Sequence, residues 1–134
     1  MSPSRSHSSP RRIAIAVVLD QEKVLVGRRE GTGELDGYCE FPGGKQQPGE
    51  TAEAAAAREC REETGLEVTP VRCLETVRHR YEFGELRLSF IECRLCRPEE
   101  NPRPPFQWLA RRELDPARFP PANRSVIARL KNRK

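Results

Sequence analysis

The sequence predicts an α/β fold, in which a mixed β-sheet carries helices on both faces. Segments rich in β-branched and aliphatic residues lie before and after an alanine-rich segment of helical character, and a short amphipathic segment closes the chain. Strands, a helix, further strands and a final helix are typical of this layered arrangement. The length of 134 residues fits one domain with a real core, which we expect to span residues 12–134.

The first predicted strands form a hairpin. Residues 12–19 (RIAIAVVL) are apolar and β-branched, as in a buried strand, and residues 23–27 (KVLVG) return after a turn at residues 20–22. A Gly-rich loop then leads to residues 38–45 (YCEFPGGK), a short extended segment that one proline and two glycines interrupt. These segments start the predicted sheet.

Residues 51–64 are predicted to form a helix with three carboxylates on one face. The segment has five alanines, six Glu or Arg residues and no Pro or Gly. At about 100° per residue, Glu59, Glu62 and Glu63 fall within roughly 100° of one another. Because like charges at this spacing repel, we expect a cation there, and carboxylates on a rigid helix suit Mg²⁺. A solvated charged surface is the alternative that the helix alone would favour.

Two long strands follow the helix. Residues 67–81 and 86–95 alternate and carry enough Val, Leu and Phe to pair around a turn at residues 82–85. The proline-rich residues 98–105 are expected to form a loop. The chain is then predicted to continue as a short strand at residues 106–109, a turn at residues 111–114 and an amphipathic helix at residues 125–130.

The net charge of +4 is concentrated at the ends of the chain. Residues 1–12 hold three arginines and residues 129–134 hold four Lys or Arg, which leaves 17 basic against 20 acidic residues between them, a net of −3. This distribution argues against a surface for duplex nucleic acid built into the fold. Residues 1–11 are expected to form a disordered basic tail. No membrane segment is predicted, and five cysteines, an odd number, fit free thiols in the cytoplasm.

The predicted helix belongs to a longer pattern of fixed spacing. The formula G-x5-E-x7-R-E-U-x-E-E-x-G-U, where U is aliphatic, describes the positions of Gly44, Glu50, Arg58, Glu59, Glu62, Glu63, Gly65 and Leu66. This pattern resembles the signature of the Nudix hydrolases, with Cys60 at a position that usually carries Ile, Leu or Val. Cys behaves as a small buried hydrophobe, so the departure is mild. The resemblance implies an α/β/α sandwich, a catalytic helix and hydrolysis of a diphosphate linked to another moiety.

The resemblance also implies roles for individual residues. Arg58, Glu59 and Glu62 are the expected catalytic residues, of which Arg58 would position the glutamates and Glu59 would bind metal or activate water. The metal would be Mg²⁺, with Mn²⁺ as a substitute. Its expected ligands are the Gly43 carbonyl oxygen, Glu59, Glu62 and Glu63, with Glu50 and the loop residue Glu100, or Glu99 beside it, as weaker candidates.

Substrate choice is predicted to depend on residues 119–123 (FPPAN), which resemble the F-P-x-A-N segment by which the MutT branch of the family recognises oxidised guanine. The amide of Asn123 offers a donor and an acceptor, whereas guanine presents two acceptors and 8-oxoguanine a donor at N7 and an acceptor at O6. Alternatively, Asn123 caps the final helix. The other expected substrate contacts are Arg29, Phe41, Lys45 and Phe83.

Three functions follow from these patterns. The first is an Mg²⁺-dependent hydrolase that cleans the nucleotide pool by converting 8-oxo-dGTP to 8-oxo-dGMP and diphosphate. The second is a Nudix hydrolase of a pyrimidine triphosphate or a dinucleoside polyphosphate, which Tyr81 weakly suggests. The third is a non-catalytic MutT-like module that binds oxidised bases, although such modules usually lack the glutamates that this chain keeps. We expect a nucleotide as partner, no membrane, and a monomer or weak dimer.

Overall fold

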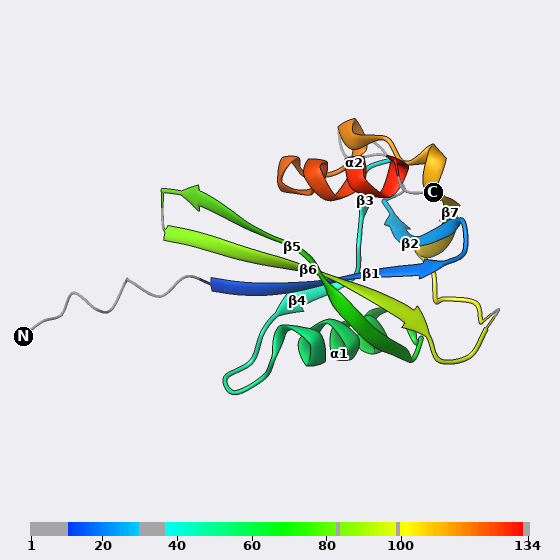
Figure 1. Cartoon of the computed structure of the whole chain (residues 1–134), viewed down its shortest axis with the longest axis horizontal. Coiled ribbons are helices and arrows are strands. Elements are labelled where there is room, and N and C mark those ends of the chain that lie inside the picture. The colour runs from blue at the N-terminus through cyan, green and yellow to red at the C-terminus, as the bar shows by residue number, and fades with distance from the viewer. Residues whose placement is uncertain (1–10, 30–36, 83, 99, 133–134) are drawn as a thin grey trace, which may run out of the picture.

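The computed structural model describes residues 11–29, 37–82, 84–98 and 100–132. In these residues seven strands form one mixed sheet that lies between two helices, as Figure 1 shows. Helix α1 (Ala52–Thr64) covers one face and helix α2 (Arg124–Asn132) the other. The predicted α/β fold with helices on both faces is therefore confirmed. No helix in the described ranges is long and apolar enough to cross a membrane.

The sheet is organised around its first strand. Strand β1 (Arg11–Asp20) pairs in parallel with β6 (Gly84–Leu95), which pairs antiparallel with β5 (Val68–Tyr81). The other strands are β2 (Lys23–Arg28), β3 (Cys39–Glu40), β4 (Gly43–Lys45) and β7 (Phe106–Ala110). β2 pairs antiparallel with both β3 and β7.

On the side of β1 that faces away from β6, the sheet divides into two branches. The first half of β1 pairs with β4, with Ile13 opposite Lys45 and Ile15 opposite Gly43. The last two residues pair instead with β2, with Leu19 opposite Val24. β4 carries two glycines, and the Glu59 side chain of α1 lies directly against Gly44. This division of the sheet places the start of the Nudix-like pattern next to the helix that completes it.

Alternation along β1 divides the core into two layers. Ala14, Ala16 and Val18 pack against α1, whose Ala55, Ala56 and Cys60 are fully buried. Small residues on both sides let the helix lie close to the sheet. Cys60 fills an aliphatic position, as the sequence predicts. The opposite layer joins Ile15, Val17 and Phe90 to Val126, Ile127 and Leu130 of α2.

Element boundaries differ from the sequence predictions by one or two residues. β6 begins at Gly84, which pairs with Tyr81, so the strand starts two residues before the predicted position 86. The final helix starts at Arg124 because a 3₁₀ turn, Pro121–Asn123, leads directly into it. The predicted turn at residues 111–114 contains a 3₁₀ turn, Arg111–Glu113.

Candidate active site

Helix α1 carries its own start and stop signals. The Thr51 side chain accepts a hydrogen bond from the Ala54 amide at 3.0 Å, which satisfies one of the free N–H groups of the first turn. At the other end Gly65 has a φ of 83°, and its amide donates to the Arg61 carbonyl oxygen. Only glycine adopts this left-handed conformation at little cost. The helix is therefore a rigid platform for the side chains between these caps.

The Arg58 guanidinium joins the carboxylates of this platform. Its Nε lies 2.7 Å from Glu50 Oε2, and a terminal nitrogen lies 3.1 Å from Glu59 Oε2 and 3.4 Å from Glu62 Oε1. It also donates to the Lys45 carbonyl oxygen at 3.1 Å, which links the helix to β4. The hydrogen bond from Arg58 is the main cause that lowers the pKa of Glu50, and the same pair raises the pKa of Arg58. One side chain thus offsets part of the repulsion among three carboxylates.

Glu63 lies on the side of the helix that faces β4. Its Oε1 accepts a hydrogen bond from the Gly43 amide at 3.4 Å. Burial, followed by hydrogen bonding to Glu59, raises the pKa of Glu63 to about 7. Burial and the neighbouring Glu59 disfavour the charged form of Glu63, and a divalent cation beside it would favour that form.

Gly44 makes room for the Glu59 carboxylate. A Cβ at this position would lie 2.4 Å from both Glu59 Cδ and Oε2, far inside van der Waals distance. A Cβ on Gly43 would meet the Ala14 carbonyl oxygen at 2.6 Å. The Nudix-like pattern includes Gly44, and the structure explains why: with β4 beside α1, any side chain at this position would collide with Glu59.

The oxygen atoms at this platform are of the kind that bind a hard divalent ion. In the described residues no three His, Cys, Asp or Glu side chains are grouped closely enough to hold a metal ion together, and Arg58 pairs with Glu50 and Glu59. Carboxylate oxygens of Glu59 and Glu63 and the backbone of Gly43 are the oxygen ligands that Mg²⁺ prefers. Glu100, another predicted ligand, has a buried Oε1 that has no hydrogen-bond partner within the part of the chain described.

A loop contact that the sequence did not predict holds the end of α1. Arg103 donates from its backbone to the Thr64 carbonyl oxygen at 2.8 Å and from its side chain to the Glu62 carbonyl oxygen at 3.2 Å. Pro98 and residues 100–105 form neither helix nor strand, as predicted, and the Trp108 indole donates to the Glu100 carbonyl oxygen. An arginine in a proline-rich loop gave no signal of this role, because its partners are backbone carbonyls elsewhere in the chain.

A second candidate site lies on the α2 face of the sheet. Phe41 and Asn123 line an apolar pocket of about 290 Å³, together with Leu86, Leu88 and Pro120. Phe41 packs against Phe119, with ring centroids 5.1 Å apart. Asn123 is 5% exposed and lies inside the 3₁₀ turn that runs into α2. A helix cap has non-helical backbone angles, so this position is not typical of a cap.

The remaining predicted substrate residues lie apart from this pocket or outside the described residues. Arg29 lines a neighbouring pocket of about 230 Å³, which shares Glu40 and Pro120 with the pocket of Asn123. Lys45 lies at the end of β4, exposed, beside Arg11 and Arg12. Phe83, Glu99 and the side chain of Tyr81 fall outside the described residues. The roles of all these residues stay predictions.

Comparisons with known proteins agree with this architecture. The family model for the NUDIX domain matches residues 14–129. The 8-oxo-dGTP diphosphatase of Escherichia coli is 33% identical over 125 residues, which cover 90% of this chain and 95% of that protein. The enzyme of the same name from Proteus vulgaris is 39% identical over 80 residues, which cover 59% of this chain and 71% of that protein. The solution structure of the MutT protein of Staphylococcus aureus superposes with a TM-score of 0.73 at 28% identity and covers 95% of this chain and 99% of that one. The glutamate helix and the sequence matches, which extend over almost the whole chain, lead to the same conclusion. The chain belongs to the Nudix hydrolase family.

Proposed function

We propose that this protein is a nucleoside triphosphate diphosphatase that converts 8-oxo-dGTP to 8-oxo-dGMP and diphosphate. The observation that carries the proposal is the pairing of two sites on opposite faces of one sheet. The carboxylate platform of α1 suits cleavage of a phosphoanhydride, and the pocket that holds Phe41 and Asn123 has the size and lining of a base site. The names of the two curated relatives described above support the same substrate.

The platform would hold Mg²⁺, or Mn²⁺, through Glu59, Glu62, Glu63 and the Gly43 carbonyl oxygen, with Glu50 and Glu100 as further candidates. When bound, the ion would neutralise charge on the phosphate oxygens and lower the pKa of a coordinated water. The protein's own part is positioning. Arg58 keeps Glu59 in place through the 3.1 Å ion pair, and the caps of α1 keep the helix from shifting.

Base selection would come from Asn123. Its amide can accept from N7–H and donate to O6 of 8-oxoguanine, whereas guanine, with two acceptors, leaves one of these pairs unmade. Burial of Asn123 makes the difference larger, because a buried polar group that stays unpaired is costly. Phe41 would stack on or flank the base, and Arg29, from the adjoining pocket, would contact the phosphates.

The test is diphosphate release from a panel of nucleotides with Mg²⁺. The proposal expects a clear preference for 8-oxo-dGTP over dGTP, CTP and dinucleoside polyphosphates. Equal rates on dGTP and 8-oxo-dGTP would refute the oxidised-base assignment. If no nucleotide is hydrolysed but oxidised nucleotides still bind, the chain is a base-binding module.

Glu62→Gln separates chemistry from folding in the same assay. Its side chain is 55% exposed, so the substitution should abolish activity and leave the thermal midpoint unchanged. We further propose that the enzyme acts in the cytoplasm, where nucleotides are made, as a monomer or weak dimer.

A further inference from the structure

Three arginines form a row across the sheet, on the face that carries α1. Arg12 of β1 pairs with Arg87 of β6 in the parallel register, and Arg87 pairs with Arg78 of β5 in the antiparallel register. Directly paired residues point to the same face. Ala14 and Ile91, which share the alternation of Arg12 and Arg87, pack against α1. We call Arg12, Arg78 and Arg87 the arginine row.

The arginine row has no acidic partner among the residues that the structure describes. In the described ranges no carboxylate forms an ion pair with any of the three side chains. The Nε atom of Arg87 is buried, and it finds no hydrogen-bond partner among the described residues. Like charges directly opposite each other destabilise a sheet. Protection of a sheet edge explains Arg78 alone, because β1 and β6 are inner strands at this level.

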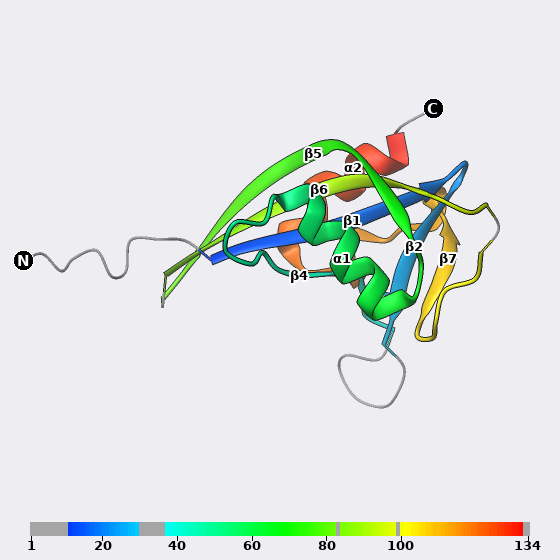
Figure 2. The ribbon, with the colours of Figure 1, turned by 90° about the horizontal axis from the view of Figure 1, so that it is seen from below.

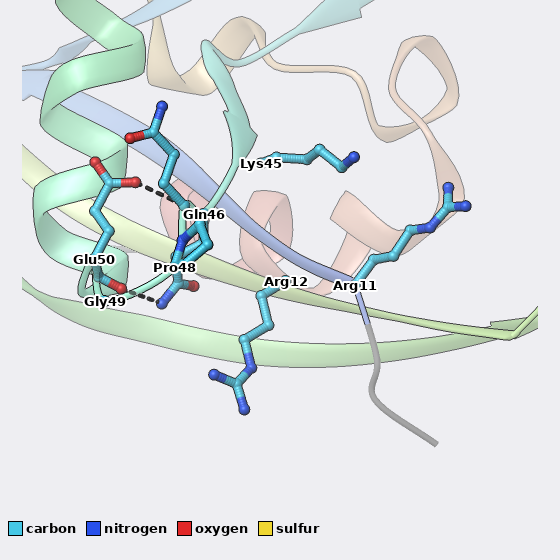
Figure 3. Close-up of a pocket in the computed structure, with 8 residues that line it drawn as sticks. Arg11, Arg12, Lys45, Gln46, Pro48, Gly49 and Glu50 are labelled. Carbon is cyan, nitrogen blue, oxygen red and sulfur yellow. Dashed lines mark hydrogen bonds between the residues drawn. The ribbon is translucent and has the colours of Figure 1, made fainter. Parts of the chain in front are cut away.

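A pocket at the end of the row extends the positive charge. Figure 3 shows it between the start of β1, with Arg11 and Arg12, and the loop that holds Gln46, Pro48 and Gly49. Its volume is about 380 Å³, and Lys45 contributes a further cation. Figure 2 shows the start of β1 and the β5–β6 pair extending together past α1.

The one carboxylate in this pocket has a partner already. Glu50 is bound by Arg58 at 2.7 Å, and this contact lowers the pKa of Glu50. Among the described residues that line the pocket, its cations therefore face no free carboxylate. The same Arg58 touches Glu59 at 3.1 Å, so the pocket adjoins the carboxylate platform.

We propose that the arginine row and this pocket bind two linked phosphate groups, those of inorganic diphosphate or of the end of a nucleotide's phosphate chain. Neighbouring strands lie about 4.8 Å apart, so the row presents guanidinium groups at intervals of about 5 Å. Arginine forks bind phosphate oxygens through paired hydrogen bonds. This site lies outside the carboxylate platform and the base pocket, and it needs no hydrolysis to be filled.

Binding of inorganic diphosphate in the presence of a chelator tests the proposal, measured by titration calorimetry at low ionic strength. Without metal, the carboxylates of α1 repel the anion, so binding reports on the row. The double variant Arg78→Gln/Arg87→Gln should raise the dissociation constant at least tenfold. The matched control is Arg112→Gln, an exposed arginine of the 3₁₀ turn Arg111–Glu113, which should change it less than twofold.

Two outcomes would overturn the proposal. The first is no binding by the unaltered protein at millimolar diphosphate, and the second is an equal loss of affinity in the double variant and the control, which would indicate general charge attraction. Far-UV circular dichroism and the thermal midpoint of the double variant verify that it is folded. Because neither metal nor turnover is involved, failure here leaves the proposed function untouched.

Two further ligands identify the source of the phosphates. If dGTP binds more tightly than diphosphate, and Asn123→Ala removes the difference, the row receives the phosphate chain of a nucleotide. Equal affinities indicate free diphosphate, the product of the proposed reaction. If a single-stranded oligothymidylate binds through the row more tightly than either, the ligand is nucleic acid and the assignment to linked phosphates of a small molecule is wrong.

Discussion

Gly44→Ala should disable the carboxylate platform without unfolding the protein. The new Cβ would lie 2.4 Å from Glu59 Cδ, and ordinary contact between such atoms begins near 3.5 Å, so the carboxylate must retreat by about 1 Å. Gly44 does not have the positive φ that disfavours alanine, and the clashing atoms belong to the end of a side chain. Glu59 can therefore move while the backbone stays in place. A displacement of about 1 Å at a catalytic group can cost about 10² in rate.

The assay is kcat for diphosphate release with saturating Mg²⁺, together with the thermal midpoint. We expect kcat to fall about 100-fold and the midpoint to shift by less than about 4 °C. Gly49→Ala is the matched control, because Gly49 has a φ of 78° and open space around its Cβ position. It should lose about 1 kcal/mol of stability and keep its kcat within about twofold. If Gly44→Ala keeps more than a third of the kcat, the close packing of Glu59 on β4 does not matter for catalysis.

Four further substitutions or conditions test other parts of the structure. Arg58→Ala removes the shared partner of the carboxylates and should lower kcat at least about tenfold, and an unchanged kcat in this variant would show that the ion pairs do not position the site. In the metal-free protein the pKa of Glu63 is raised to about 7, so between about pH 4.5 and 7 the folded state binds more protons than the unfolded state. The free energy of unfolding, measured by chemical denaturation, should therefore decline as the pH rises through this range. Glu63→Gln should flatten the decline. Asn123→Ala should lower the selectivity for 8-oxo-dGTP over dGTP, measured as the ratio of their kcat/KM values, by a factor that corresponds to about 1–3 kcal/mol. A lower thermal midpoint with unchanged selectivity would identify a structural residue instead. Arg87→Gln should raise the free energy of unfolding by about 0.2–1 kcal/mol by removing like-charge contacts, so a clear loss of stability would contradict the description of the row as one without acidic partners among the described residues.

Local signals predicted most of the fold. Thr51 and Gly65 set the ends of α1 because caps act within a few residues. Strands β1 and β2 were predicted within one residue because their apolar runs are interrupted by a polar turn. The 3₁₀ turn before α2 was not predicted. Pro120 and Pro121 are compatible with several turn conformations, so their presence does not select one.

Contacts between distant segments could not be predicted from the sequence. The pattern includes Gly44 and Glu59 but says nothing of the distance between them, which depends on how β4 pairs with β1. Arg103 binds carbonyl groups that any residue could supply. The arginine row needs the registers of two strand pairs, and a shift of one residue would move Arg87 to the other face. Helix spacing, by contrast, is regular enough to place Glu59, Glu62 and Glu63 together in advance.

The two faces of the sheet carry different parts of the predicted function, so substitutions on one face need not affect the other. Residues of the base pocket belong to the layer between the sheet and α2, whereas the glutamates stand on a helix packed against the other face. A substitution that reshapes the pocket around Phe41 and Asn123 repacks only the first layer. Strand β4 lies beside β1, and its Gly44 lies against the Glu59 side chain of α1. New substrate preferences can therefore arise in the layer between the sheet and α2 without rebuilding the hydrolytic machinery.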